Sequence, residues 1–489
     1  MSPTSPAASE LSSPLSTLAD GSPRRLDPKR ATAIAYVASM FMSAMDSHIV
    51  NVMIPTLSRS FHSPLAAVQW TAIGYVLSLA VFIPASSWLG DRFGTKRIFI
   101  VALVLFIAAS AACGQARNLP ELVLSRVVQG AGGGMLSPVA TSMLYRAYPP
   151  AERARMTRLL VVPILLGPIL AQPIGGLLVT KASWRWAFYL NIPVGLATLA
   201  LVTRGLVEHR QSAGRRFDAT GFVLSAAGLA SLLYAISEGA LSGWSSPGVI
   251  ASAVAGLGAL VAFVLVEPRR REPLLNLSLF SDRLFAATNA VAALNTAAFS
   301  GLLYLAPVFL QEARGLSALD AGLTSFATAF GVMCASQSVG RFYSRIGPRR
   351  MAALGQLGLA AALCTFLLVG PGTNLWWVRG VLFLAGSANS ATMIAIQTSM
   401  FARITSANTG FGAAIFNASR QSSTALGIAV FTTIISEVAG SKLHAFHVTF
   451  VAAAGFALAA GLAAALLIRD EDARATMTQT SAPPARSHR

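Results

Sequence analysis

The chain is predicted to be an all-α polytopic membrane protein, with two six-helix bundles and two further helices inserted between them. Only 11% of its 489 residues are charged, 54% are hydrophobic, and the mean hydropathy is +0.61, unlike the balance of a soluble protein. Apolar runs long enough to cross a bilayer recur along the whole chain. A short basic motif with glycines occurs in each half, which indicates an internal repeat.

Fourteen apolar segments are candidate transmembrane helices, because a span needs about 20 residues. They are residues 31–55, 66–89, 98–114, 119–146, 156–180, 185–204, 218–237, 247–267, 285–311, 318–343, 350–370, 374–400, 408–436 and 447–468. An even number of spans places both chain ends on the same side of the membrane.

The distribution of Lys and Arg predicts which side that is. With a cytoplasmic N-terminus, 28 of the 37 Lys and Arg residues fall in inside segments and 6 in outer loops. The remaining three, Arg126, Arg379 and Arg420, lie within spans. Positive charge accumulates on the cytoplasmic side, so both termini are predicted to be cytoplasmic, in a bacterial-type plasma (inner) membrane. The net charge of +18 is therefore attributed to topology and contact with anionic lipid, and we expect no nucleic-acid partner.

The spans divide the chain into five segments. Residues 1–30, rich in Ser, Pro and Ala, are predicted to be a disordered cytoplasmic tail. Residues 31–211 are expected to form the N-terminal six-helix bundle, residues 212–275 the two additional helices, and residues 276–470 the C-terminal six-helix bundle. Residues 471–489 form a second predicted disordered tail.

Motifs of enzymes and ATP-driven pumps are missing from the sequence. No phosphate-binding P-loop, metal-ligand cluster or hydrolase nucleophile motif occurs. The three cysteines, Cys113, Cys334 and Cys364, lie within apolar runs and suggest neither a disulfide framework nor a metal site. We therefore expect a protein that is not an enzyme and has no catalytic residues, no cofactor and no metal.

The sharpest functional candidate is Asp46, about fifteen residues into the first span. A carboxylate at that depth is costly, so it should face a cavity or a partner, and membrane acids usually mark proton pathways. Arg126 in the fourth span is its natural counter-ion. The alternative interpretations are an acid satisfied by polar neighbours in its own helix and a fixed structural salt bridge.

The turn between the second and third spans carries a second motif. Its cations favour the cytoplasmic face, and its glycines allow a tight turn. The residues concerned are Gly90, Asp91, Arg92, Gly94, Lys96 and Arg97. A related string between Gly340 and Arg350 follows the tenth span but lacks the aspartate.

The fifth span is interrupted by Gly167, Pro168, Pro173, Gly175 and Gly176. Proline frees a backbone carbonyl and glycine permits close helix crossing, so this helix is a candidate gate. The sequence leaves open the alternative of a kinked helix that is merely tightly packed.

Several aromatic, methionine and polar residues are candidates for lining a substrate cavity between the bundles. The apolar and aromatic candidates are Phe41, Met45, Trp70, Tyr75, Phe299, Tyr304, Phe326, Phe330 and Met393, and the polar ones are Gln129, Asn417, Arg420 and Gln421. Arg420 could attract an acidic substrate group or tie helices together.

Taken together, these motifs resemble the fourteen-span drug:proton antiporters of the major facilitator superfamily, over residues 31–468. The loop motif matches that family at all six residues named above. The first-helix pattern matches at Asp46, Ile49, Val50, Asn51 and Pro55, and the fourth-helix pattern at Arg126, Gln129, Gly130 and Gly132. The fifth helix departs from it, because Ala171 and Gln172 stand where the antiporter motif has Gly-Pro.

The resemblance implies export of hydrophobic, often cationic compounds by rocking of two bundles, driven by the proton gradient. It ties Asp46 and Arg126 to proton coupling and the loop motif to conformational switching. We therefore expect a monomeric, proton-coupled exporter of amphipathic or hydrophobic small molecules. The alternatives are a carrier of a dedicated metabolite or lipid-like anion, suggested by Arg420, Arg379 and the scarcity of buried acids, and a non-transporting sensor.

Overall fold

The structure is a computed structural model, which describes residues 27–148, 167–168, 170–206, 208, 217–270, 273–339, 342–400, 402–404 and 409–473. Within these ranges the regular secondary structure is entirely helical. The long helices are α1 (Pro28–Phe61), α3 (Trp70–Phe93), α4 (Thr95–Gln115), α5 (Leu119–Ala147), α8 (Asn191–Gly205), α9 (Ala219–Ser242), α10 (Pro247–Val266), α11 (Arg283–Glu312), α12 (Ala318–Val339), α14 (Pro348–Thr365), α15 (Leu375–Ser399), α16 (Thr409–Glu437) and α17 (Lys442–Leu467). Short helices are α2 (Leu65–Val68), α7 (Arg185–Tyr189) and α13 (Tyr343–Ile346), and residues 170–181 are also helical.

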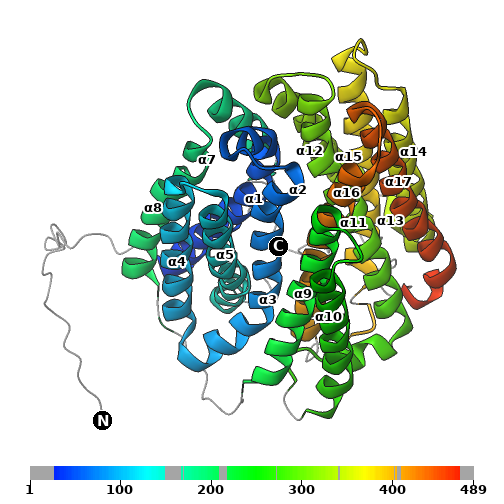
Figure 1. Cartoon of the computed structure of the whole chain (residues 1–489). Helices are drawn as coiled ribbons and strands as arrows, with labels where there is room; N and C mark the ends of the chain where they lie inside the picture. Colours follow the sequence, from blue (N-terminus) through cyan, green and yellow to red (C-terminus); the bar gives the residue numbers. More distant parts are fainter. Residues whose placement is uncertain are drawn as a thin grey trace, which may run out of the picture.

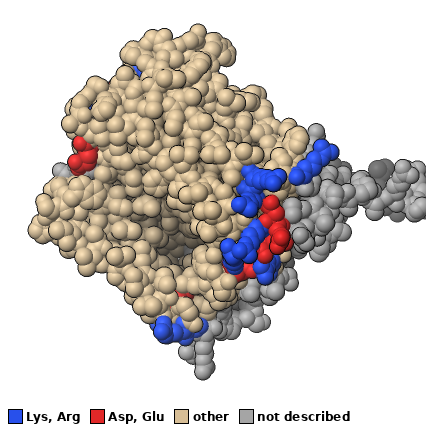
Figure 2. Space-filling model, turned by 90° about the vertical axis from the view of Figure 1, so that its right-hand side faces the viewer, with Lys and Arg blue, Asp and Glu red and all other residues tan. Residues whose placement is uncertain are grey.

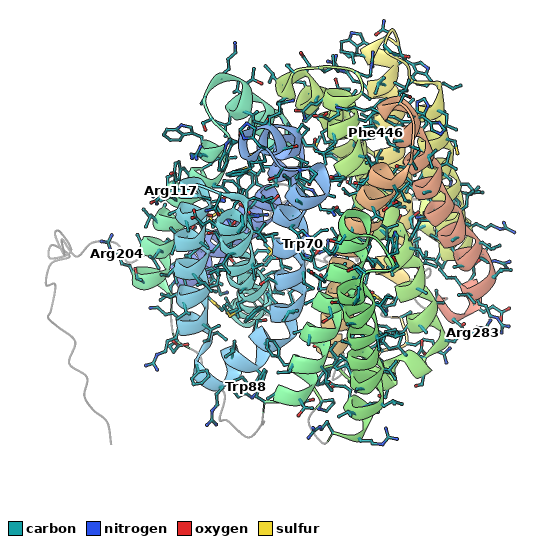
Figure 3. All side chains as sticks on the ribbon, in the orientation of Figure 1. Trp70, Trp88, Arg117, Arg204, Arg283 and Phe446 are labelled. Carbon is teal, nitrogen blue, oxygen red and sulfur yellow. The ribbon has the colours of Figure 1, made fainter. Side chains whose placement is uncertain are left out.

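The long helices form two bundles that stand side by side (Figure 1). In the first, α5 packs against α1, α3 and α4, and α8 packs against α1 and α4. In the second, α15 packs against α12 and α14, and α17 packs against α11 and α14. Figure 3 places Trp70 on the side of the first bundle that faces the second, and Trp88 near the lower end of α3.

The two inserted helices form a hairpin at the boundary between the bundles. Helix α9 packs against α3 of the first bundle and α16 of the second, whereas α10 packs mainly on α9. Phe222 of α9 meets Phe82 of α3 edge to face at 5.7 Å, and Thr433 of α16 donates a hydrogen bond to the Ile236 carbonyl of α9. Most of α10 is exposed apolar surface, as expected for a helix that faces lipid.

Eleven helices of the described chain are long and apolar enough to cross a membrane. Helices α5 and α16 occupy two more of the predicted spans but are not among the eleven, because glycine, polar residues and a central arginine lower their hydropathy. The fifth predicted span, 156–180, lies partly outside the described residues. The predicted tails also lie mostly outside the described residues. The exceptions are the start of α1 at Pro28, with its cap Asp27, and a 3-10 turn at Asp470–Ala473.

The predicted loop between the second and third spans was wrong. The sequence predicts a loop of about eight residues between the second and third spans, but α3 runs to Phe93 and α4 begins at Thr95. Only Gly94 separates them, with φ at 103°, in the region that glycine adopts without strain. Polar residues do not end a helix when its last turns extend beyond the apolar layer, so Gly90–Phe93 stay helical.

Side-chain caps fix where several helices begin. Asn118 accepts from the Glu121 amide at 2.9 Å to start α5, and Asp282 accepts from the Phe285 amide at 2.9 Å to start α11. Asp218 caps α9 in the same way through the Gly221 amide. Oδ2 of Asp218 and Oε2 of Glu267 both border the space beside Gly221, where they are buried and no described residue donates a hydrogen bond to them.

Charged residues gather at the edges of the molecule. Figure 2 shows one face on which Lys, Arg, Asp and Glu lie mainly near the lower right edge, while its hollowed centre and most of its area are uncharged. A broad uncharged belt is what a lipid-facing surface requires.

Candidate functional site

Asp46 of α1 and Arg126 of α5 form an ion pair inside the first bundle. Nη1 of Arg126 donates to Oδ2 of Asp46 at 2.5 Å, and both side chains are 0% exposed. The predicted partnership is therefore present in the structure. A charge pair removed from water is costly unless further hydrogen bonds complete it.

Amide side chains supply those further hydrogen bonds. Oδ1 of Asp46 accepts from Nδ2 of Asn191 at 2.8 Å and from Nε2 of Gln129 at 2.9 Å. Gln129 also accepts from Arg126 Nη1 at 2.7 Å, and Ser110 accepts from both amides. The Asp46 carboxylate thus receives three donors from two helices, which compensates much of its desolvation.

The guanidinium is fixed from its other sides as well. Its Nε donates to the Thr71 carbonyl at 2.9 Å, and its Cζ lies 4.0 Å from the ring centre of Tyr75. Stacking on an aromatic face suits the weakly hydrated guanidinium. Nη2 of Arg126 and Oδ1 of Asn191 are buried and have no hydrogen-bond partner among the described residues, so the network has unused hydrogen-bonding capacity beside the ion pair.

The glycines that follow Arg126 bring the neighbouring helices close enough to build this site. A Cβ on Gly130 would lie 2.3 Å from the Tyr75 carbonyl of α3, and one on Gly132 would lie 2.9 Å from the Ala102 carbonyl of α4. On Gly134 it would lie 2.7 Å from the Leu79 carbonyl. The glycine run therefore permits the close helix approach expected from the sequence.

The turn at Gly94 is tied to the end of α8 by Glu208. Its carboxylate accepts from the backbone amides of Lys96 at 3.0 Å and Arg97 at 3.1 Å, where it caps the N-terminus of α4. The Lys96 ammonium donates back to the Leu206 carbonyl at 2.7 Å. The sequence singled out the turn but not Glu208, which is 112 residues from Lys96.

The second bundle has the same arrangement. Gly347 has φ at 80°, and the Arg349 amide donates to Asp470 Oδ1 at 2.9 Å at the start of α14. The resemblance between the two motifs in the sequence is therefore matched by equivalent acid-capped turns. Gly340 and Arg341, which open the second motif, lie outside the described residues.

The helix of residues 170–181, part of the fifth predicted span, contacts the second bundle where α12 begins, at the upper end in Figure 1. A Cβ on Gly176 would lie 2.4 Å from the Ala318 carbonyl, and one on Gly322 of α12 would lie 2.4 Å from the Gln172 carbonyl. Gly175 packs on Ile49 of α1, and Gly167 lies against the Phe41 carbonyl. Pro168 is half-buried, and Pro173 borders Gly322.

Helix α1 joins this contact to the ion pair. Asn51 Nδ2 donates to the Leu303 carbonyl of α11 at 3.4 Å, and Gln311 Nε2 of α11 donates to the Val52 carbonyl at 2.9 Å. Two consecutive turns of α1 therefore carry Asp46, the contact with Gly175 and the contacts with the second bundle.

Comparison with known proteins is decisive for the family. The family model described as Major Facilitator Superfamily matches residues 36–219 and 211–428. The chain belongs to the Major Facilitator Superfamily. It is therefore a multi-pass membrane transporter of small molecules, not an enzyme.

Relatives and solved structures agree with that membership. MdtD of Serratia proteamaculans, named for multidrug resistance, is 32% identical over 415 residues, 84% of this chain and 87% of its own. A "Multidrug resistance protein B homolog" of Mycobacterium tuberculosis is 35% identical over 348 residues, 70% of this chain and 64% of its own. A D-xylose-proton symporter shares the fold, with a TM-score of 0.65 at 14% identity over 90% of this chain and 98% of its own. A bacterial homologue of the human lysosomal transporter Spinster, solved in an inward-facing conformation, has a TM-score of 0.62 at 17% identity, over 94% of this chain and 99% of its own.

In this superfamily member the predicted cavity residues fall into three groups by burial. Tyr75, Gln129 and Tyr304 are fully buried and Met45 nearly so, and Tyr75 and Gln129 belong to the ion-pair network. Phe330 is 40% exposed and stacks on Phe326. The half-buried candidates are Phe41, Trp70, Phe299, Phe326, Met393, Asn417, Arg420 and Gln421.

The network includes residues that the sequence did not single out. Ser110 and Thr71 look like ordinary small polar residues of apolar helices, and each joins the site through a partner at least 19 positions away. Asn191 is the one with a usable signal, because an amide at the start of an apolar span needs a partner.

Proposed function

We propose that this transporter is a proton-coupled exporter of hydrophobic or amphipathic small molecules that works by alternating access. The observation that carries the proposal is the fully buried Asp46–Arg126 pair, with its carboxylate held by two amides. An intramembrane acid in such a position is the usual carrier of a coupled proton. The multidrug-resistance names of the relatives support export as the direction and drugs as the cargo.

The coupling follows from electrostatics. When Asp46 is ionised, Arg126, Gln129 and Asn191 hold α1 against α5 and α8. Protonation removes the charge and turns one acceptor oxygen into a donor, so the pull of the three donors weakens. Because α1 also carries the contacts of Asn51 and Val52 with α11, a shift of α1 is transmitted to the bundle interface.

The remaining parts are assigned by the same reasoning. The turn around Gly94, with Glu208, moves as one unit with α4 and α8 and serves as the conformational switch. The close contact of Gly176 with Ala318 serves as the gate at the upper end, which we assign to the outside. Both termini then lie in the cytoplasm of a bacterial-type inner membrane, the proton gradient is the energy source, and the monomer needs no cofactor.

The test compares wild type with Asp46→Asn in proteoliposomes that carry a pH-sensitive dye in the lumen. We expect wild type to move protons against substrate, and Asp46→Asn to lose the proton flux and uphill transport. Asp320→Asn is the matched control, because it makes the same chemical change at an exposed helix start. Uphill transport by Asp46→Asn, or wild-type transport that an uncoupler leaves unchanged, would contradict the proposal.

A further inference from the structure

Arg420 of α16 is a cation at membrane depth for which the described residues provide no counter-ion. Among the described residues no carboxylate lies within ion-pair distance of it, and its side-chain hydrogen bond, to Asn417 Oδ1, is at 3.5 Å, the limit for such a bond. Arg126 shows the contrast, because its Nε and Nη1 make bonds of 2.5–2.9 Å. Arg420 is thus not held as a structural arginine is held.

The surroundings of Arg420 come from both bundles. His48 of α1 lies within electrostatic range of its guanidinium, although α1 and α16 belong to different bundles. Thr424, one turn further along α16, forms a hydrogen bond of 3.1 Å with Ser300 of α11, and Phe299, the residue before Ser300, is half-buried. In secondary transporters the substrate binds between the two bundles, where half-buried side chains such as these line the site.

No acid of the described chain is available there to balance the charge. Asp46 is committed to Arg126 and is 0% exposed. The described acids of the second bundle lie at helix ends or in the terminal 3-10 turn, and they are Asp282, Glu312, Asp320, Glu437, Asp470, Glu471 and Asp472. An arginine in the membrane is costly unless an anion or strong acceptors neutralise it.

We infer that Arg420, assisted by His48, binds the anionic group of an amphipathic substrate, such as a carboxylate, sulfonate or phosphate. The planar guanidinium offers two parallel donors to an oxyanion, Asn417 orients it, and Phe299 provides apolar surface for the rest of the molecule. This inference rests on the proposed export function and names its cargo as amphipathic acids rather than lipophilic cations.

The test is direct binding to the purified full chain in nanodiscs of zwitterionic phosphatidylcholine. Three dansyl probes share one undecyl tail and end in a carboxylate, its methyl ester or a trimethylammonium group. We expect the carboxylate to bind about tenfold more tightly than the ester, the effect of one charge-assisted contact. Arg420→Gln should abolish this difference, and Arg420→Lys should retain part of it. Arg379→Gln should keep it, because Arg379 stacks on Trp376 elsewhere.

The inference is overturned if wild type binds ester or ammonium as tightly as carboxylate, or if Arg420→Gln keeps the preference. Should Arg420→Gln fail to fold, the wild-type comparison and Arg420→Lys still decide. Adding phosphatidylglycerol to the nanodiscs distinguishes two sources of the anion. If this lipid competes with the carboxylate probe, the natural ligand is a lipid headgroup, and if it does not compete, the ligand is a free acid.

The experiment distinguishes failure of proton coupling from failure of the proposed substrate class. Uncoupler-sensitive transport of the ammonium probe, without carboxylate binding, would uphold the proposed function and defeat this inference. Tight carboxylate binding with transport that an uncoupler leaves unchanged would do the reverse.

Discussion

Gly176→Ala should open the upper contact between the bundles. The added methyl group would lie 2.4 Å from the Ala318 carbonyl and 2.9 Å from Leu319 Cα, against 3.4 Å or more for ordinary contact. Both atoms are backbone, so no side-chain rotation relieves the clash, and about 1 Å of separation between the bundles is needed. Overpacking of this kind costs about 1–3 kcal/mol. Because only the closed arrangement contains the clash, its population relative to the open one should fall by a factor of about 5–150.

The assay is the labelling rate of Gln172→Cys by a membrane-impermeant maleimide, in a background that lacks the three native cysteines. Residue 172 is 2% exposed in the closed contact, so its labelling reports opening. Gly176→Ala should raise the rate at least fivefold, and Gly322→Ala should do the same from the opposite bundle. Gly258→Ala is the control, because nothing lies within 4 Å of its added methyl group. Wild-type labelling of a folded Gly176→Ala protein would refute this account of the contact.

The remaining predictions concern carboxylates at the lower end of the bundles. Glu208→Ala and Asp470→Ala each remove an acid from a helix N-terminus and should each cost about 1 kcal/mol of stability, seen as a lower thermal unfolding temperature than for the exposed Glu471→Ala. Equal unfolding temperatures for all three would show that the caps do not matter. Glu267→Gln supplies an N–H donor to the nearby Asp218 carboxylate and should raise the free energy of unfolding by about 1–3 kcal/mol. Glu437→Gln, the same change at an exposed position, should leave it unchanged. A lower unfolding temperature for Glu267→Gln would mean that both carboxylates need their charge.

Part of this site can be predicted from the sequence because charged residues are rare within apolar spans. An acid and an arginine in two apolar spans have few possible partners, so the sequence alone is enough to pair Asp46 with Arg126. The turn around Gly94 is legible because glycine with clustered cations marks a short connection on the cytoplasmic side. Periodicity and length are enough to place most of the long helices within a few residues.

Other parts are hidden in the sequence because they depend on how helix faces meet. Asn191 is 145 residues from Asp46, and Glu208 is 112 from Lys96, so no local pattern links them. Gln129 is predicted to line the cavity, but it is buried and bonds Asp46. Its sequence neighbours are apolar or glycine, so they do not show which face of the helix it occupies. The contact of Gly176 with Ala318 depends on the relative placement of two bundles, which one sequence does not encode locally.

Helix α9 has a consequence for how an oily molecule could reach the transporter. It lies along the seam between α3 and α16, touching both, and its Phe222 is packed on Phe82 while Ile236 is bonded to Thr433. A compound dissolved in the bilayer would have to displace α9 to slip sideways through this seam. The inserted hairpin therefore covers this seam, so entry from the bilayer between α3 and α16 requires α9 to move first.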